Sequence, residues 1–176
     1  ARRNAELSGM LGNIAASSMS QYELSQSFRT IVRSSQSQKD KLIALREHQK
    51  RENFGSTRLC ELIFDASFDK HIATQLGKQV SAAKGILQEV ATTSDTQKVI
   101  IGKLEQLTCR NKLLSSFKDI LFAFYDAEIL EEDEICDWYN VPTPQYVTQE
   151  QLNELRKEAF PFIEWLQTCS EEEEED

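Results

Sequence analysis

Two segments of the chain each combine a tryptophan with a run of carboxylates, and together they carry the most distinctive chemistry in the sequence. Residues 125–138 hold Trp138 and seven acidic residues, and residues 161–176 hold Trp165 and another seven. Carboxylates that rim an aromatic side chain suit a lysine-rich and flexible polypeptide, which associates fast and with strong salt dependence. The sequence therefore predicts a binding site for a cationic partner rather than an active centre.

The charge of the chain is strongly polarised along its length. Residues 126–176 contain 17 of the 29 acidic residues and only two basic ones, Arg156 and Lys157, which gives this part a net charge of −15. Residues 1–125 carry a net charge of +6, so the overall value of −9 hides the asymmetry. Such an asymmetry bears on partners and association rates rather than on the fold. Two blander interpretations stay open: acidic tails often only keep a protein soluble, and tryptophans are more often core residues than exposed ones.

A basic segment over residues 29–51 forms a possible second surface, which consists of Arg29, Arg33, Lys39, Lys41, Arg46, Lys50 and Arg51. These side chains could contact phosphates, for instance in ribosomal RNA, or simply form a solvated helix face. The aromatic residues are not interleaved with the charges, which argues against stacking on single-stranded nucleic acid. The acidic end argues against nucleic acid as the main ligand of the whole domain.

The sequence contains no recognisable catalytic or metal-binding pattern. A phosphate-binding glycine loop, a serine nucleophile elbow and a zinc helix of the His-Glu-x-x-His type are all missing. His48 and His71 are expected at the surface, and the carboxylate pairs fall in segments that water should reach, so they form no tuned acid–base pair. We expect neither a metal nor a cofactor, and no enzymatic activity.

Cysteine usage and hydropathy indicate a cytoplasmic protein with no membrane span. The four widely spaced cysteines include no Cys-x-x-Cys pair, which favours reduced and mostly packed thiols. The longest apolar run, residues 120–125, is far shorter than the ~20 residues that a membrane helix needs. Because the chain begins with Ala1 rather than Met, we expect it to be a piece of a longer protein.

Helical periodicity of apolar residues dominates the chain, and no segment alternates long enough to predict a strand. Eight or nine helices joined by short breaks predict an all-α fold of antiparallel pairs. Pattern alone leaves two architectures open, a HEAT-like α-solenoid and an irregular bundle. We expect a leader over residues 1–19, a helical domain over residues 20–169, and a solvated, disordered acidic tail over residues 170–176.

Several helix boundaries follow from local signals. Ser20 with Glu23 forms a predicted capping box at a helix start, and Ser94 is the predicted cap of a later helix. A helix through Phe68 is expected to close at Gly77, and the helix over residues 113–124 should be the most buried. Pro161 is expected to kink or divide the last helix.

At the two acidic segments the chain resembles the C-terminal two-tryptophan HEAT domains of eukaryotic translation initiation factors. The resemblance rests on residues 124–132 with the segment that follows them up to Trp138, and on residues 161–166 with the acidic run that comes after them. Such domains occur in initiation factor 5, in the epsilon subunit of the exchange factor for initiation factor 2, in the large scaffold of the cap-binding complex, and in mimics of factor 5. Residues 59–64, 103–105 and 146–159 are most similar to factor 5.

The resemblance implies a non-catalytic assembly module with an α-solenoid fold. Its acidic boxes would bind lysine blocks of the beta subunit of initiation factor 2. Further expected contacts are initiation factor 1 and a subunit of initiation factor 3, in the preinitiation complex on the small ribosomal subunit. The GTPase-activating region of factor 5 belongs to a separate N-terminal domain, and nothing like it occurs here. Two rivals share the boxes: a guanine-nucleotide exchange domain, as in the epsilon subunit, and a factor 5 mimic.

The resemblance also assigns partner-binding residues by position. The first acidic segment contributes Glu128, Glu131, Glu132, Asp133, Glu134 and Asp137, and the second contributes Glu164, Glu171, Glu172, Glu173, Glu174 and Glu175. Trp138, Phe162 and Trp165 would shape and support the surface that these carboxylates form.

Overall fold

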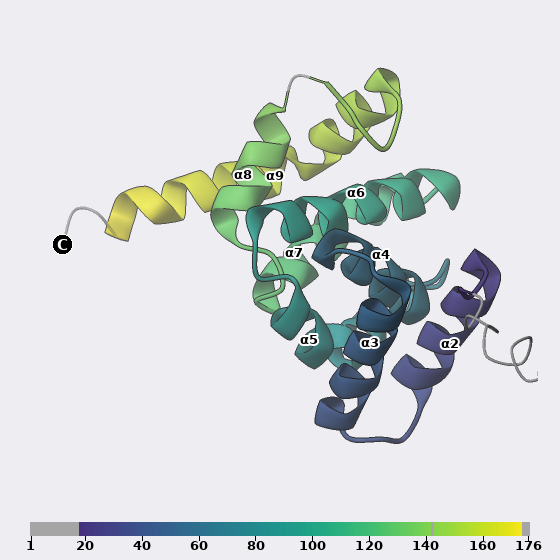
Figure 1. Ribbon diagram of the computed structural model, residues 1–176. Helices are drawn as coiled ribbons and strands as arrows, with labels where there is room; N and C mark the ends of the chain where they lie inside the picture. Colours follow the sequence, from purple (N-terminus) through teal and green to yellow (C-terminus); the bar gives the residue numbers. More distant parts are fainter. Residues whose placement is uncertain (1–17, 142, 174–176) are drawn as a thin grey trace, which may run out of the picture.

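The computed structural model describes residues 18–141 and 143–173, and it shows side-chain surroundings through residue 169. Figure 1 shows an all-helical chain, and the described part contains eight α-helices and one short 3-10 helix. The helices are α2 (Gln21–Arg33), α3 (Gln38–Glu52), α4 (Ser56–Ser67), α5 (Leu76–Val90), α6 (Ser94–Arg110), η1 (Leu114–Ser116), α7 (Phe117–Asp126), α8 (Glu132–Asn140) and α9 (Gln149–Glu173).

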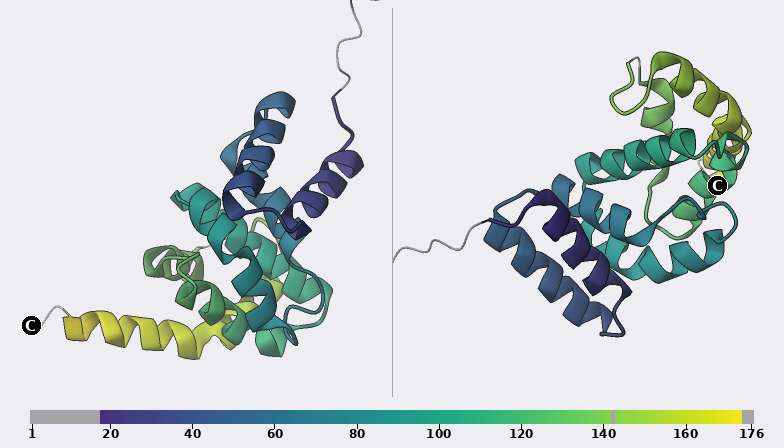
Figure 2. Two further views of the ribbon diagram at one scale, coloured as in Figure 1. Left: turned by 90° about the horizontal axis from the view of Figure 1, so that it is seen from below. Right: turned by 90° about the vertical axis from the view of Figure 1, so that its right-hand side faces the viewer.

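The helices form two layers, and each helix packs on the one two places further along the chain. The helices α2, α4, α6 and α8 contact one another in series, and α3, α5, α7 and α9 do the same. Three pairs of successive helices also contact each other: α2 with α3, α4 with α5, and α8 with α9 (Figures 1 and 2). This is the arrangement of a HEAT-like solenoid, so the predicted fold class is confirmed and the irregular bundle is excluded.

Reciprocal side-chain caps fix two helix starts, and the one at Ser20 is the capping box that the sequence predicts. The Ser20 hydroxyl accepts from the Glu23 amide while the Glu23 carboxylate accepts from the Ser20 amide, at 3.2 and 2.8 Å. Thr148 and Gln151 form the same reciprocal pair ahead of α9, at 3.2 and 2.9 Å. Each pair satisfies backbone donors that have no partner inside the helix, which stabilises a helix start by about 1 kcal/mol.

Two predicted boundaries are wrong, for local reasons. Residues 68–75 form turns instead of a helix that closes at Gly77, and α5 begins at Leu76. The Asp69 carboxylate accepts from the His71 amide and from the Gln79 side chain, at 2.9 and 2.8 Å, and these bonds hold the turns. The cap of α6 is Thr93 rather than its neighbour Ser94, whose hydroxyl is directed to another helix.

Four side chains of α7 have no exposed surface: Phe117, Ile120, Leu121 and Phe124. The prediction that this helix is the most buried is nevertheless wrong, because α4 and α6 contain six and nine buried residues against the four of α7. Helix α7 lies between α5 and α9 and contacts both, so its buried apolar side chains face protein in successive turns (Figure 2). Because these four side chains are held in the core, α7 fixes the position of the acidic segment that follows it.

The last helix is continuous and longer than the sequence suggests. Pro161 lies inside α9 and does not divide it, and the helix runs to Glu173, four residues into the segment predicted as a tail. Residues 174–176 lie outside the described part of the chain. So do residues 1–17 of the predicted leader, whereas the amide of Met19 donates to the Glu52 carboxylate at 3.0 Å. Within the described residues, no helix has the length and hydrophobicity that crossing a membrane requires.

The glycine at position 102 lets a loop approach α6 closely, and this predicts the effect of a substitution. A Cβ atom built on Gly102 would lie 2.3 Å from the Tyr146 ring, whereas one on Gly77 in α5 would meet nothing within 4 Å. Alanine favours a helix interior over glycine by about 1 kcal/mol. We expect Gly77→Ala to stabilise the protein by up to about that amount. Gly102→Ala should instead destabilise it by about 1–3 kcal/mol, because the ring must move. Urea unfolding of both variants checks this, and equal stabilisation would contradict the close contact.

Candidate acidic and aromatic interaction surface

Four aromatic side chains from α7 and α9 meet in one group, which we call the aromatic cluster: Phe122, Tyr125, Phe162 and Trp165. The ring centroids of Phe162 and Trp165 lie 6.0 Å apart in a stacked arrangement. The Phe122 ring meets both of them edge to face, at 5.6 and 6.0 Å, and the Tyr125 ring does so at 5.7 and 6.2 Å. These are the favourable geometries for aromatic pairs. The cluster therefore joins the start of the first acidic segment to the second.

The aromatic cluster is half open to solvent. Phe122 and Trp165 keep 42% and 45% of their surface exposed, while Phe162 is buried beneath them. An open hollow borders the two exposed rings and is also lined by Lys118, Asp119 and Pro161. The sequence analysis missed Phe122, although its place on α7, one position away from the buried stripe, was a signal that it points outward.

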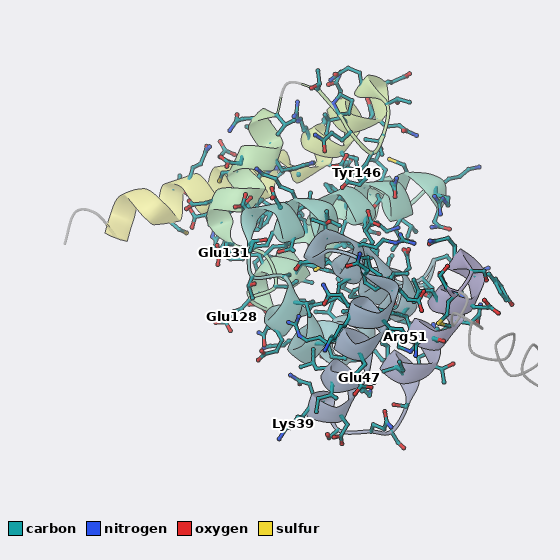
Figure 3. All side chains as sticks on the ribbon, in the orientation of Figure 1. Lys39, Glu47, Arg51, Glu128, Glu131 and Tyr146 are labelled. Atoms are coloured by element: carbon teal, nitrogen blue, oxygen red, sulfur yellow. The ribbon has the colours of Figure 1, made fainter. Side chains whose placement is uncertain are left out.

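The structure describes the side-chain surroundings of seven of the carboxylates predicted to bind a partner, and five of these are exposed. The exposed ones are Glu128, Glu131, Asp133, Asp137 and Glu164. Figure 3 shows Glu128 and Glu131 at one edge of the molecule, both directed outward. Glu128 adopts the left-handed backbone conformation, with φ of 56°, and this turn directs Ile129 and Leu130 into the core. Asp119 and Asp126 on α7 are exposed as well and extend the acidic surface beyond the predicted set.

Two predicted carboxylates are less accessible. Glu134 is buried, and its carboxylate accepts a hydrogen bond from the Ser94 hydroxyl at 2.9 Å. Beside it the Gln97 side chain accepts from the Glu131 amide at 2.8 Å, so the start of α6 holds the start of α8. Glu132 is half-buried. Glu134 therefore has a structural role, whether or not it also meets a partner.

The two tryptophans occupy different environments. Trp138 is buried, its ring centroid lies 5.6 Å from that of Phe117, and its indole N–H donates to Glu105 at 3.1 Å. Trp165 is half-exposed in the aromatic cluster. The core interpretation thus holds for Trp138, which meets Glu105 of α6, but not for Trp165, which borders an open hollow.

Glu105 is a buried carboxyl that the sequence analysis did not identify as special. Its side chain lies between α6 and Trp138, and only 5% of the residue is exposed. Burial raises its pKa from the ordinary 4.5 to about 7, although the indole hydrogen bond and the Arg156 charge act in the opposite direction. No local sequence pattern could reveal the burial of Glu105, because Trp138, the residue that contacts it, lies 33 residues away in the chain.

The basic segment lies on α2 and α3, at the end of the solenoid away from α8 and α9 (Figure 1). Arg29, Arg33, Lys39, Arg46 and Lys50 are exposed there. The Lys41 ammonium instead donates to the Val32 carbonyl at 2.9 Å, and Arg51 pairs with Glu52 at 3.2 Å. Figure 3 shows Lys39 and Arg51 together with the acidic Glu47 on α3, so the charges of this face are mixed.

The remaining predicted positions fall on the end of α9 or on polar turns. Glu171–Glu173 lie within α9 by backbone, and Glu174 and Glu175 fall outside the described residues. His71 lies in an exposed turn, and the His48 ring contacts Phe28. Among the residues that the structure describes, no group of three potential metal ligands comes together.

Comparison with known proteins identifies relatives over the C-terminal part of the chain. Residues 96–176, which include α6–α9, match the family described as W2: eIF4-gamma/eIF5/eIF2-epsilon. Eukaryotic translation initiation factor 5 of Mus musculus is 30% identical over 112 residues, which are 62% of this chain and 25% of that protein. The protein krasavietz of Drosophila melanogaster is 31% identical over 90 residues, 51% of this chain and 20% of that protein. The chain therefore spans about a quarter of the length of the curated relatives it matches.

A solved structure shares the fold. It is described as the C-terminal domain of translation initiation factor 5 at low pH, and it superposes with a TM-score of 0.68 at 23% identity. The match covers 88% of this chain and 94% of the other. The likeness extends well before residue 96 and so includes helices that the family match leaves out.

The buried carboxyl of Glu105 predicts a pH dependence of stability. Since its pKa is about 7 in the folded protein and near 4.5 when unfolded, the folded state keeps a proton that the unfolded chain releases. The stability contribution of this group is therefore complete below about pH 4.5 and is lost as the pH rises to about 7. Between about pH 4.5 and pH 7 the free energy of unfolding of the wild type should fall by on the order of 3 kcal/mol more than that of Glu105→Gln.

Urea unfolding at a series of pH values measures the difference between the two proteins. The Trp138 indole N–H resonance gives a second measurement, because it should titrate with a midpoint near 7 in the wild type and stay constant in Glu105→Gln. The Trp165 indole lies in the aromatic cluster and makes no hydrogen bond to Glu105, so it is an internal reference. Parallel stability curves for the two proteins would refute the assignment.

Proposed function

We propose that this chain, whose residues 96–176 match the family described as W2: eIF4-gamma/eIF5/eIF2-epsilon, acts as a domain of that kind and that its acidic and aromatic surface binds lysine-rich segments of a partner in translation initiation. The observation that supports this most directly is the aromatic cluster. Its exposed rings, Phe122 and Trp165, border a hollow that Asp119 also lines. The two helices that carry these rings, α7 and α9, also carry the exposed carboxylates Asp126 and Glu164. The net charge of −15 over residues 126–176 supports the same proposal.

The surface suits lysine because of the two parts of that side chain. The aliphatic stem can lie against the exposed faces of Phe122 and Trp165, and the ammonium can then reach a carboxylate such as Glu164. An ammonium above an aromatic face gains about 0.5–1 kcal/mol at an exposed site. Each contact is weak, so a segment with several lysines is needed for appreciable affinity, and salt should weaken it.

The partner that we propose is the beta subunit of initiation factor 2, through its lysine blocks. Initiation factor 1 and a subunit of initiation factor 3 are further proposed partners within the preinitiation complex. The likeness to the C-terminal domain of factor 5 supports this choice. The domain acts as a hub for assembly, and any GTPase-activating function would belong to a different part of a longer protein.

Charge reversal on the surface tests the proposal. Glu131→Lys with Asp133→Lys should weaken the binding of a lysine-block peptide roughly tenfold at low salt, because two attractions become repulsions. The matched control, Glu47→Lys with Glu89→Lys, makes the same change of net charge on α3 and α5, and should leave most of the affinity. Trp165→Ala should cost about three- to fivefold. Calorimetric titration measures all three.

Two outcomes of that titration would refute the proposal. One is an equal loss of affinity in the surface and control variants, which would show that only the net charge matters. The other is binding that stays the same between low and high salt, because a contact between exposed charges must weaken when it is screened. Circular dichroism of each variant verifies that the helices are intact.

Guanine-nucleotide exchange is the rival function, because the family also includes the epsilon subunit of the exchange factor. The proposed function predicts that the purified domain leaves the rate of GDP release from initiation factor 2 unchanged. A fluorescent GDP analogue, chased with excess unlabelled nucleotide, measures that rate. Acceleration by this domain alone would favour the exchange domain instead.

A further inference from the structure

A cavity of about 180 Å³ lies between α6, α8, the segment before α9, and α9 itself. Its walls are mostly apolar and include Ile101, Trp138, Tyr146 and Leu152. An engineered apolar cavity of about 150 Å³ in another protein holds one benzene molecule, so this cavity has the size for a single six-membered ring. It is separate from the aromatic cluster of the proposed function, whose residues do not line it.

Four residues with polar or charged side chains line the cavity, Lys98, Glu105, Thr143 and Gln145, and of these only Glu105, with its carboxyl, is buried. One oxygen of that carboxyl accepts from the Trp138 indole at 3.1 Å. The other oxygen, Oε2, is buried and has no hydrogen-bond partner among the described residues. A buried acceptor without a partner costs about 1–3 kcal/mol, so a ligand that brings a donor to this atom gains more than its apolar surface alone would give.

The charges around the cavity decide which donor fits. The guanidinium of Arg156 lies close enough to Glu105 to lower its pKa against the effect of burial, and Lys98 lines the same cavity. An ammonium would therefore meet two cations beside one carboxyl, and it would also lose its hydration. A neutral O–H donor on an apolar ring avoids both costs.

Specific contacts hold the residues around the opening of the cavity in place. Tyr146 packs against the backbone of Gly102, and the Gln106 side chain donates to the Tyr146 carbonyl at 3.5 Å. Arg156 donates to the carbonyls of Trp138, at 3.2 Å, and Val141. Figure 3 shows Tyr146 above α6, in the segment that leads to α9. A ligand that enters here would meet a formed pocket.

We propose that this cavity binds the phenol ring of a tyrosine from a partner polypeptide, with the phenol O–H donating to Oε2 of Glu105 in its ionised form. The ring fills the apolar space between Ile101, Trp138 and Leu152, and the peptide chain stays outside beside Lys98. This inference goes beyond the lysine-rich binding above and does not depend on it, since it concerns a different surface and a neutral side chain.

The test uses 4-methylphenol, which is the side chain of tyrosine, and toluene, which lacks the hydroxyl. Each is titrated into the whole chain at about pH 8.5, above the pKa of about 7 of Glu105, so that Oε2 is an acceptor. The Trp138 indole N–H resonance is followed, and the Trp165 indole is the internal reference. We expect 4-methylphenol to shift the Trp138 signal and to bind about tenfold more tightly than toluene, because only it satisfies Glu105. Butylamine, which represents lysine, should not bind there.

Two variants and one larger ligand make the proposal falsifiable. Glu105→Leu removes the carboxyl and leaves no hydrogen-bonding group in its place, so the preference for 4-methylphenol should disappear while toluene still binds. Ile101→Phe fills the space and should abolish binding of both, and if either variant fails to fold, the comparison of 4-methylphenol with toluene on the wild type still decides. N-acetyl-tyrosinamide should bind like 4-methylphenol.

Three results would overturn the proposal. If 4-methylphenol leaves the Trp138 signal unchanged, the cavity takes no phenol. If toluene binds equally well, the Glu105 carboxylate makes no hydrogen bond that favours the phenol. If 4-methylphenol binds but N-acetyl-tyrosinamide does not, the site accepts small phenols and no tyrosine of a polypeptide. None of these results depends on whether a lysine-rich peptide binds the acidic surface.

Discussion

The packing of α7 against α9 is the contact on which the proposed site depends. It places Phe122 and Tyr125 of one helix against Phe162 and Trp165 of the other, with ring centroids 5.6–6.2 Å apart. The two acidic segments are separated by more than 20 residues in the chain, and this contact is what unites them on one surface. Without it, each segment would be a short charged stretch with too few contacts to hold a partner.

The solenoid explains why the contact forms. Every helix packs on the one two places later, so α9 inevitably covers the face of α7 that α5 leaves open. The buried stripe of α7 supplies most of the apolar surface for this step, and its four fully buried side chains tolerate little movement. A rigid support of this kind suits an interaction surface, because the exposed rings and carboxylates keep their positions before a partner arrives.

Polar groups fix the other side of the same unit. Ser94 and Gln97 hold the start of α8, and Glu105 holds its tryptophan. These bonds all run from α6, so α6 sets both the exposed acidic start of α8 and its buried aromatic end. A buried carboxyl is costly to keep, and Glu105 has only one of its oxygens satisfied within the described chain. The cavity beside it follows from the same imperfect closure between α6, α8 and α9.

The sequence alone determined the all-helical class, several helix starts and the acidic character of the C-terminal half. These follow from periodicity, from local caps and from charge, which act over a few residues. Tertiary structure decided the features that depend on contacts between residues distant in the chain. It separated solenoid from bundle, replaced a predicted helix at residues 68–75 by turns that Gln79 holds, and placed one tryptophan inside and the other at the surface. It also raised the pKa of Glu105, because burial and charge depend on neighbours that are distant in the chain.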